Sequence, residues 1–416
     1  MEQKLILHCD LNNFFATASL IDKPQLQNKP IAIAGDVSKR HGIILAKNMP
    51  AKLKGVNTAE PIWQALQKCP DLQTLRPNYK RYIDYSNIVK DIYRRYTGNI
   101  EPFGIDEAWL DISTPNKDIR YAEKMAYDIK ETIKNETGLT VSIGVSFSKI
   151  FAKLGSDYKK PDAVTVISKK NYRSFVWPMP IRSLLCVGKK TEKKLLDVSI
   201  TTIGDLANTP DTTLVMLLGK SGLMLKNFAN GKDTSFVKQA DHAFDFKGIG
   251  NSMTTTKDLL NHHDVFSSFL MLSEMVSKRL MNKSVCASCI CIELKDTELK
   301  KITRQKKIEN PVFISDDIVK IAMELYNENW DISERPIRAI GIRATQFESL
   351  ADASQVSFFD TPKKQQRELL ELTKNEILKK YGKDAIKRAS FIDKNSPKEK
   401  EYKEQHDASP LSFYRE

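Results

Sequence analysis

The sequence predicts a multidomain protein of the α/β and α+β classes, because the pattern of its elements changes twice along the 416 residues. Up to about residue 165, apolar runs typical of strands alternate with segments at helical spacing, which indicates an α/β layer structure. Residues 166–231 then contain short helix-like pieces and an excess of Lys and Arg. From about residue 247 to 345 strands and helices alternate again, and a chain of this length is expected to form about two to four domains.

The first part of the chain contains the clearest elements. Asp10 directly follows an apolar strand, and the apolar residues of the longest helix are followed by Gly138, where a C-terminal stop belongs. In chain order, the sequence predicts strands over 5–9 and 31–34, a helix over 121–135, a strand over 139–145, a helix over 148–157 and a strand over 163–167.

The later part of the chain is expected to form a second mixed region. Residues 232–246 lack clear periodicity, which is typical of a linker. Beyond residue 348 the chain turns polar, and from residue 394 it is a mixture of Lys and Glu that we expect to be disordered. Between these segments the sequence predicts helices over 265–280 and 316–327 and strands over 288–294 and 337–344.

The composition excludes several classes of protein. With 65 Lys and Arg against 52 Asp and Glu, the net charge of +13 indicates an anionic partner, nucleic acid first and a membrane surface second. A membrane protein is not expected, because no stretch approaches about 18 consecutive apolar residues and the N-terminus is too short for a signal peptide. Six cysteines are too few for a disulfide scaffold, which favours a reducing cytoplasm.

One cysteine pattern needs a separate interpretation. Cys286 and Cys289 form a C-x-x-C, and Cys291 follows. No second pair follows at zinc spacing, and residues 285–294 alternate like a strand. We therefore expect ordinary buried or half-buried side chains rather than a metal site.

Three carboxylates carry the chemistry. Asp10 ends the first strand, and Asp106 and Glu107 stand side by side after Pro102 and Gly104, which can supply the turn that lets both serve one site. Hard oxygen ligands from two strands suit Mg²⁺, and a pair of Mg²⁺ ions suits an in-line phosphoryl transfer. On spacing alone, a polar strand end and an exposed acidic turn are the more common explanation.

Three motifs, in this order and spacing, resemble the Y-family of translesion DNA polymerases, of the bacterial polymerase IV or polymerase V catalytic-subunit type. The resemblance covers roughly residues 4–360, and Gly104 and Trp109 replace the usual Ser and Tyr of the most specific motif without removing a metal ligand. The motifs are Cys9-Asp10-Leu11-Asn12-Asn13-Phe14-Phe15-Ala16, Gly104-Ile105-Asp106-Glu107-Ala108-Trp109-Leu110-Asp111 and Ser146-Phe147-Ser148-Lys149-Ile150-Phe151-Ala152-Lys153 with Lys160-Pro161.

The resemblance implies a right-hand polymerase with a ferredoxin-like palm, small fingers, a helical thumb with a helix-hairpin-helix, and an α+β little-finger domain that binds DNA. The implied domains are the palm at 1–20 and 76–165, the fingers at 21–75, the thumb at 166–231, a linker at 232–246, the little finger at 247–348 and a C-terminal tail at 349–416.

The resemblance also implies roles in the palm. Asp10, Asp106 and Glu107 become catalytic metal ligands, with the carbonyl of Leu11 as a further ligand. The backbone amides around Asn13, Phe14 and Phe15 are expected to bind triphosphate oxygens at a helix start.

Phe15 aligns with the steric gate, a ring that clashes with a ribose 2′-hydroxyl; the alternative is a plain core aromatic, which we expect Phe14 to be.

The phosphate-binding cations show a departure from the family. The fingers pattern is close to N-Y-x-A-R, whereas this chain has Asn48-Met49-Pro50-Ala51-Lys52, so Met49 loses a hydrogen bond and Lys52 lacks the planar fork of Arg. Lys160 aligns well and is expected to reach the triphosphate. The alternative for Lys52 and Lys160 is a solvated surface lysine.

Residues 185–206 are similar to a helix-hairpin-helix, in which backbone amides bind a DNA phosphate without reading bases. Cys186 stands where a Gly is usual, so the hairpin is expected to be less ideal; a helical hairpin without a ligand is the alternative. The DNA-binding residues expected here are Val187, Gly188, Lys189 and Lys190.

In the last folded domain, a basic strand face is expected to grip DNA phosphates, and Arg338 and Arg343 near the ends of the last strand add to it. Any one of these cations is more often solvated, so the cluster is the evidence. Its members are Lys300, Lys301, Arg304, Lys306 and Lys307.

Residues 355–359 resemble the peptide that binds the bacterial sliding clamp, through Gln355, Phe358 and Phe359. The alternative is that this segment packs back on its own domain. The chain is thus expected to be a template-directed DNA polymerase that uses two Mg²⁺ ions, dNTPs and primer-template DNA. We expect it to have low fidelity and to act in lesion bypass during an SOS-type damage response. Its expected location is the bacterial cytoplasm, near the nucleoid.

Alternative functions stay open at this point. A catalytically silent DNA-binding repair subunit would keep the basic domains, and a palm-type enzyme such as a nucleotide cyclase would keep the carboxylates. Within the family, a polymerase IV-like enzyme working alone and a polymerase V-like catalytic subunit needing an accessory protein are both possible. The length of 351–416 slightly favours the partnered form.

Overall fold

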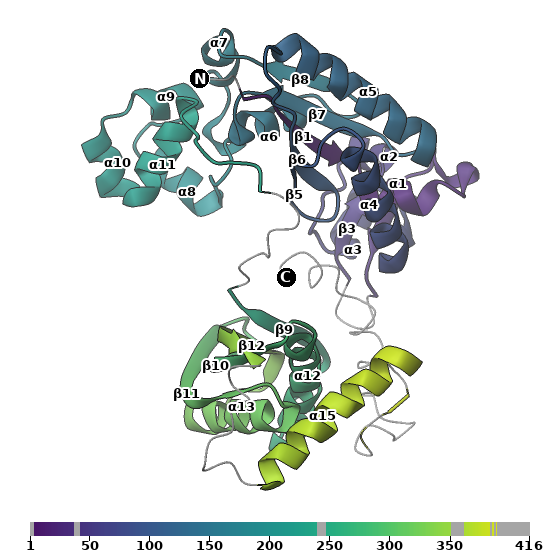
Figure 1. Cartoon of the computed structure of the whole chain (residues 1–416), viewed down its shortest axis with the longest axis vertical. Helices are drawn as coiled ribbons and strands as arrows, with labels where there is room; N and C mark the ends of the chain where they lie inside the picture. The colour runs from purple at the N-terminus through teal and green to yellow at the C-terminus, as the bar shows by residue number, and fades with distance from the viewer. Residues whose placement is uncertain are drawn as a thin grey trace. The chain divides into compact units, whose positions relative to one another are not determined.

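The computed structural model describes residues 4–36, 42–238, 247–350, 362–382, 385, 386 and 388. The chain divides into two compact units, of which the first holds the described residues 4–35 and 43–238 and the second those from 247 onward (Figure 1). None of the helices within the described ranges combines the length and the apolar character needed to cross a membrane.

A five-stranded sheet forms the centre of the first unit, in the order β5-β6-β1-β7-β8. Strand β1 lies in the middle, antiparallel to both neighbours, and all six of its residues are buried. Such a strand is covered on both faces, which explains why its sequence is a nearly continuous apolar run. The strands are β1 (Ile6–Leu11), β5 (Ile100–Pro102), β6 (Glu107–Asp111), β7 (Val141–Ser146) and β8 (Val164–Ile167).

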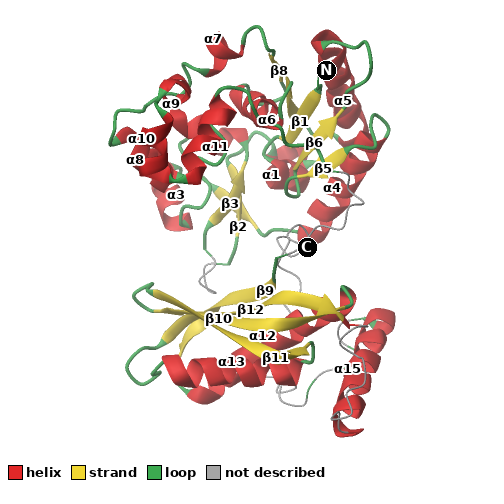
Figure 2. Ribbon diagram, turned by 60° about the vertical axis from the view of Figure 1, so that its left-hand side comes forward, coloured by secondary structure: helices red, strands yellow, loops and turns green. Residues whose placement is uncertain are grey.

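Helices cover the two faces of this sheet (Figure 2). Leu5, Leu7 and Cys9 face a core shared with α4 (Tyr79–Arg94) and α5 (Ile119–Thr137). The alternate residues of β1 face α6 (Lys149–Tyr158), which approaches very closely because β7 carries Gly144. A Cβ on Gly144 would lie 1.9 Å from the carbonyl oxygen of Ala152, so a larger side chain would push α6 away from the sheet.

The predicted helices of this sheet are confirmed, and their caps explain their limits. Asp118 accepts hydrogen bonds from the backbone at the start of α5, and Gly138 ends that helix with φ of 71°. Ser148 caps α6 by accepting from the amide of Phe151. The strands predicted over 5–9, 139–145 and 163–167 are present with shifts of at most two residues at their ends.

Two smaller clusters complete the first unit. A three-stranded sheet in the order β3-β2-β4 packs against α2 and α3, and a set of short helices forms an apolar core together with residues of α6. The elements around the small sheet are α1 (Phe14–Leu20), η1 (Pro24–Leu26), β2 (Ile31–Ala34), β3 (Ile44–Lys47), α2 (Met49–Leu53), α3 (Ile62–Lys68) and β4 (Gln73–Leu75). The helical cluster contains α7 (Tyr172–Val176), η3 (Ile181–Ser183), α8 (Lys189–Leu196), α9 (Ile203–Asn208), α10 (Asp211–Leu218) and α11 (Lys220–Ala229).

The segment predicted as a linker is packed in its described part. Within residues 232–238, Val237 is buried in a cluster with Ile6, Trp109 and Ala152. The Lys4 ammonium donates hydrogen bonds to backbone carbonyls at the start of this segment, 3.2–3.3 Å away. Residues 232–238 therefore belong to the first unit, and residues 239–246 lie outside the described part of the chain.

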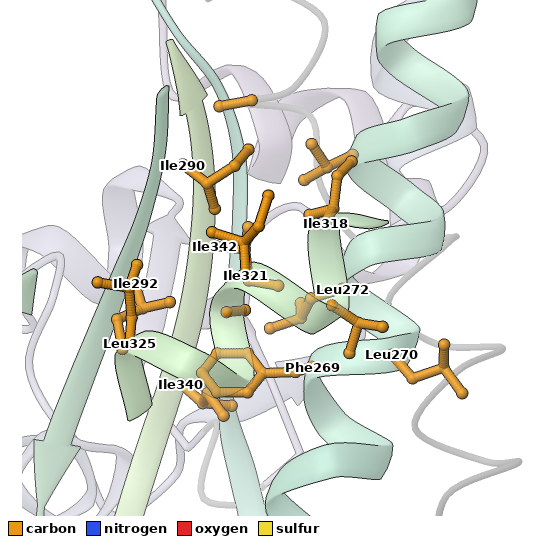
Figure 3. Close-up of a cluster of buried hydrophobic side chains, with 14 of the residues drawn as sticks. Phe269, Leu270, Leu272, Ile290, Ile292, Ile318, Ile321, Leu325, Ile340 and Ile342 are labelled. Carbon is orange, nitrogen blue, oxygen red and sulfur yellow. The ribbon is translucent and has the colours of Figure 1, made fainter. Parts of the chain in front are cut away.

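The second unit is an antiparallel four-stranded sheet, in the order β11-β10-β12-β9, with helices on one face. Figure 3 shows Phe269 and Leu272 of one helix and Ile318 and Leu325 of the other facing isoleucines of the sheet. The elements are β9 (Ile249–Leu259), α12 (His262–Asn282), β10 (Val285–Asp296), β11 (Lys301–Val312), α13 (Ser315–Asn329) and β12 (Ile337–Ser349).

A helix beyond the sheet was not predicted. The sequence suggested a tail from residue 349, but α15 (Pro362–Tyr381) packs on α12 and α13. Glu371 and Asn375 are buried, and Lys374 pairs with Glu274 of α12 at 3.2 Å. The helix escaped the sequence analysis because polar and charged contacts, rather than a long apolar stripe, hold much of it in place.

Candidate active site

The three carboxylates predicted to act together lie on neighbouring strands. In the pairing of β1 with β6, Asp10 stands opposite Glu107. The amide of Leu11 donates to the carbonyl of Asp106 at 3.0 Å, so Asp106 lies at the same end of the sheet. A turn with Gly104 at φ of 105° precedes β6, which is the device that lets two consecutive carboxylates reach one place.

These carboxylates line a pocket of about 340 Å³ within the first unit. Its wall combines the end of the central sheet, the start of α1, the small sheet and α6 with the turn that follows it. The lining residues are Asp10, Leu11, Asn13, Phe14, Phe15, Leu45, Ala46, Lys47, Thr58, Ile105, Asp106, Glu107, Asp157 and Lys160. Most of the palm residues singled out from the sequence therefore meet in one cavity.

Two lysines tie the carboxylates together. The Lys153 ammonium lies 3.1 Å from Asp10 Oδ2 and 2.8 Å from Glu107 Oε2. The Lys160 ammonium lies 2.7 Å from Asp10 Oδ2 and 2.8 Å from Asp157 Oδ1. The position of Lys160 supports the prediction that it reaches the site. Lys153 and Asp157 also take part in these ion pairs, and the sequence had suggested no role for either.

The three carboxylates lie close together, and their burial and negative charges shift the pKa values of the groups in the cluster. Burial, followed by the charges of Asp10 and Glu107, raises the pKa of Asp106 to about 7. Burial and the Glu107 charge also raise the pKa of Asp10. For Lys153, burial acts to lower the pKa, but three nearby carboxylates outweigh it and the pKa is raised. The cluster therefore favours any added positive charge.

The donor chemistry fits a divalent metal. Carboxylate oxygens are the ligands that Mg²⁺ prefers, and burial, followed by the charge of neighbouring carboxylates, raises the pKa of both Asp10 and Asp106. Across the described ranges, no three His, Cys, Asp or Glu side chains are grouped as metal ligands are, and the Lys153 ammonium contacts both Asp10 and Glu107. A divalent cation supplies the same compensation at higher charge, so these residues suit one.

His8 belongs to this site and was missed. Its Nδ1 lies 2.8 Å from Ser156 Oγ, its Nε2 lies 3.3 Å from Glu107 Oε2, and its ring meets Trp109 edge-on. Burial, followed by the Lys153 charge, holds the pKa of His8 well below its usual value, so the ring is neutral. A polar residue inside the apolar run of β1 was the available signal in the sequence.

The aromatic residues after Asp10 divide as the sequence suggested. Phe14 is buried in the core and Phe15 is half-buried, and both line the pocket. Phe15 stacks on Tyr82 of α4, and Tyr79 meets it edge-on. Asn13 adopts a left-handed conformation at the start of α1 and gives no side-chain cap, so the first amides of that helix lack one.

The predicted cation from the fingers lies elsewhere than expected. Lys52 is exposed on α2 and does not line the pocket. Lys47, at the end of β3, lines it instead, with Thr58 beside it. Asn48 caps α2 by accepting from Ala51, which shows why an Asn is needed at that position.

The helical hairpin has the predicted form. Gly188, Lys189 and Lys190 are exposed at the start of α8, and Val187 is buried beneath them. Cys186 has φ of 73°, a conformation that glycine adopts without strain. This explains why a Gly is usual there.

The basic residues of β11 do not share one face. The side chain of Arg304 donates to Asn329 Oδ1, and Lys306 pairs with Glu324, both on α13 and hence on the helical side of the sheet. Lys301 and Lys307 alternate with these two, and Lys301 pairs across the strands with Glu293 of β10. Lys300 lies in the turn before β11.

Other predicted residues are placed as follows. Arg343 is exposed on β12, next to Cys291 of β10 in the pairing. Cys286 and Cys289 are buried in β10, and the Cys286 thiol donates to the carbonyl of Glu348, as expected for ordinary strand side chains. Gln355, Phe358 and Phe359 of the clamp-like motif lie outside the described residues.

Comparison with known proteins gives consistent matches. Residues 9–157 match the model of the impB/mucB/samB family, and residues 246–358 match that family's C-terminal domain. The chain is 41% identical to a DNA polymerase IV of Acetivibrio thermocellus, over 94% of this chain and 98% of the relative. It is 34% identical to a DNA polymerase IV 1 of Bacillus subtilis, over 96% of each. A solved Y-family DNA polymerase chimera of Dbh and Dpo4 has the same fold, with a TM-score of 0.72 and 23% identity, covering 82% of this chain and 98% of that one.

Proposed function

The chain belongs to the impB/mucB/samB family and is a Y-family translesion DNA polymerase of the polymerase IV type, and from this premise we propose how its residues perform template-directed synthesis. Primer-template DNA and dNTPs are its substrates. The primer 3′-hydroxyl attacks the α-phosphorus of the dNTP, a new P–O bond forms, and pyrophosphate leaves with the electrons of the broken P–O bond.

The observation that carries the assignment is the meeting of Asp10, Asp106 and Glu107 in one pocket with Phe15 and Lys160. The carboxylates and the Leu11 carbonyl are the proposed metal ligands. Polymerases of this kind use divalent metal ions, and two bound Mg²⁺ ions would lower the pKa of the primer hydroxyl and offset the charge of the triphosphate.

The chain's own residues orient the nucleotide. Lys160 has a flexible stem and a mobile ammonium, which suits it to bind the triphosphate. The amides of Asn13, Phe14 and Phe15 are proposed to add hydrogen bonds to phosphate oxygens. Phe15 is the proposed steric gate, because its half-buried ring faces the pocket and its stacked contact with Tyr82 resists displacement.

Lys153 and His8 contact the carboxylates and support their positions. Lys153 bridges Asp10 and Glu107, so it keeps their oxygens from being driven apart by repulsion. His8 contacts Glu107 from β1 and is itself fixed by Ser156. Such supporting contacts orient ligand side chains.

DNA binding is assigned to two regions. The exposed amides and lysines at Gly188–Lys190 are proposed to bind a DNA phosphate, and Val187 supports them from the core. In the second unit, the face of the sheet opposite its helices carries Lys301, Lys307 and Arg343, and these are the proposed phosphate contacts there. Arg304 and Lys306 contact α13 in the structure, which favours a structural role for them.

The domain assignment follows the same reasoning. We propose a palm at 1–20 and 76–165, fingers at 21–75, a thumb at 166–231 and a little finger from 247, extended by α15. The apolar cores of the large sheet, the small sheet and the second unit support these divisions, and the core of the helical cluster also includes Phe151 and Leu154 of α6.

The partners beyond DNA and dNTP rest on sequence alone. We propose that residues 355–359 bind the sliding clamp and that the enzyme works in a bacterial cytoplasm. The polymerase IV names of its relatives favour an enzyme that needs no obligatory accessory protein. The silent DNA-binding subunit and the nucleotide cyclase do not fit a DNA polymerase of this family.

Primer extension with Mg²⁺ on undamaged and abasic templates tests the proposal. Asp106→Asn removes a proposed metal ligand, and we expect extension to fall by at least about a thousandfold while DNA affinity changes little. Asp128→Asn, an exposed carboxylate on α5, is the matched control and should extend normally. Extension by Asp106→Asn at the wild-type rate would reject the assigned site.

A further inference from the structure

A lysine on the small sheet occupies the pocket wall without a carboxylate partner. Lys47 ends β3, and its ammonium donates to Thr58 Oγ1 at 2.9 Å. Both residues line the pocket that contains Asp10, Phe15 and Lys160. Lys47 therefore brings a positive charge to the pocket from an element other than the central sheet and α6.

The charge of Lys47 differs from those of the other lysines in the site. Lys153 and Lys160 are each neutralised by two or more carboxylates within 3.2 Å. Lys47 forms no ion pair within the part of the chain that the structure describes, and its hydrogen-bond partner is a neutral hydroxyl. The nearby Glu60 is engaged by Lys68 and by the amide of Asn57.

The surroundings of Lys47 make its charge costly in the free protein. The side chain is half-buried, and burial, followed by the charge of Lys52, lowers its pKa. A partly desolvated ammonium near a second lysine, on which the charge of Glu60 acts in the opposite sense, is stabilised when an anion enters. The nearest space for that anion is the pocket.

Among the described residues of α2, no other side chain offers a donor to this part of the lining. Met49, the first residue of α2, has no hydrogen-bonding group, and Lys52 is exposed outside the pocket lining. Lys47 and Thr58 are the groups of the small sheet and its flanking loop that combine a donor with a place in the lining.

We propose that Lys47, oriented by Thr58, binds the polyphosphate of the incoming nucleotide from the fingers side of the pocket. The inference rests on the proposed function and adds a nucleotide-binding cation to it. Lys47 and Lys160 then hold the same polyanion from two walls, and binding relieves the repulsion between Lys47 and Lys52.

Single-nucleotide incorporation by the full chain tests this role. For Lys47→Met, which keeps most of the apolar stem, we expect KM for the dNTP to rise by about tenfold, the factor that corresponds to about 1.4 kcal/mol. The kcat and the affinity for primer-template should stay near the wild-type values. Lys47→Arg should restore most of the affinity, and Thr58→Val should raise KM by a smaller factor.

Lys54→Met is the matched control, because Lys54 lies at the end of α2 and its ammonium is already neutralised by Asp71 at 2.6 Å. Its KM should match the wild type. Inhibition by inorganic pyrophosphate gives a second measurement: the inhibition constant should rise in Lys47→Met by a factor similar to that of KM, and not in Lys54→Met.

The outcomes separate the two levels of the argument. If wild-type enzyme extends primers and Lys47→Met has an unchanged KM and pyrophosphate constant, this inference is overturned and the proposed function stands. If Lys47→Met does not fold, an unchanged KM and an unchanged pyrophosphate constant in Thr58→Val overturn it. A wild-type enzyme that extends no primer overturns the proposed function, and this inference with it.

Discussion

The ring of Phe15 lies flat on the ring of Tyr82, with the centroids 4.2 Å apart and the planes inclined by 9°. Tyr82 is fully buried, and its hydroxyl lies 2.8 Å from Ser19 Oγ. The proposed gate is therefore backed by a residue of α4 that cannot move without disturbing the core. Two predictions on sugar selection follow from this contact.

Replacing Phe15 with Ala removes the ring that faces the pocket. We expect the discrimination between dNTPs and ribonucleotides, measured as the ratio of their kcat/KM values, to fall by about ten- to 200-fold, the range for one steric difference in a pocket. Phe14→Leu, a change in the neighbouring core residue, should leave the ratio near that of the wild type. Unchanged discrimination in Phe15→Ala would remove the gate role.

Replacing Tyr82 with Leu removes the stacked surface and leaves Phe15 able to tilt. The same ratio should fall by less than in Phe15→Ala, while the protein loses about 1–3 kcal/mol of stability from altered core packing. Tyr82→Phe keeps the stacked ring and loses only the hydroxyl contact, so it should retain the wild-type ratio. Equal ratios in the Leu and Phe variants would show that the stack does not support the gate.

Replacing His8 with Leu removes the nitrogen that lies 3.3 Å from Glu107. We expect kcat to fall by about ten- to 100-fold with little change in KM for the dNTP, because residues that orient a metal ligand have effects of this size. The Mg²⁺ concentration needed for half-maximal rate should rise as well. A variant that is merely less stable, with an unchanged Mg²⁺ requirement, would argue for a purely structural His8.

Replacing Cys186 with Gly relieves the left-handed conformation at the hairpin, where φ is 73°. The side chain is exposed and little packing is lost, so we expect the helical cluster to gain about 0.5–1 kcal/mol, seen as a higher melting temperature. Cys186→Ala keeps a Cβ and should give no gain. A lower melting temperature for the Gly variant would show that unfolded-chain entropy outweighs the strain.

Asp162 supplies a prediction on pH. Its burial acts to raise its pKa, but Lys134 and Lys130, both about 3.1 Å away, outweigh burial and hold the pKa below its usual value. A carboxylate with a depressed folded pKa stabilises the protein fully above its unfolded pKa, near 3.9, and this contribution is lost as the pH falls through the folded pKa.

The difference in melting temperature between wild type and Asp162→Asn should therefore be largest near neutral pH, reflecting up to about 1 kcal/mol, and should shrink below about pH 4. Lys134→Met removes one of the two partners and should reduce that difference. A difference that grows as the pH falls would contradict the assignment.

Much of the fold could be predicted because its elements carry their own limits. The helix α5 has an apolar stripe, an Asp cap and a Gly stop, and α6 has a Ser cap, so local chemistry specifies both. The acidic motifs could also be recognised from the sequence, since Asp10 ends a strand and Gly104 supplies a turn before Asp106.

Other features depended on contacts between distant segments. Lys47 and Lys52 are both lysines near the same Asn, and only the packing of the small sheet decides that Lys47 lines the pocket. His8 acquires a role because α6 brings Ser156 to one side of its ring, and the β1–β6 pairing brings Glu107 to the other.

The basic segment on β11 illustrates the same limit. Five cations crowd the segment 300–307, but alternate residues of a strand point to opposite faces, so Arg304 and Lys306 meet α13 while Lys301 and Lys307 do not.

The sequence by itself determined the family, the strand and helix order, and the three acidic residues, because these depend on local pattern and chemical type. Only the tertiary structure decided which cations share the pocket and which face each strand residue takes, because distance between side chains is set by sheet register and packing across the chain.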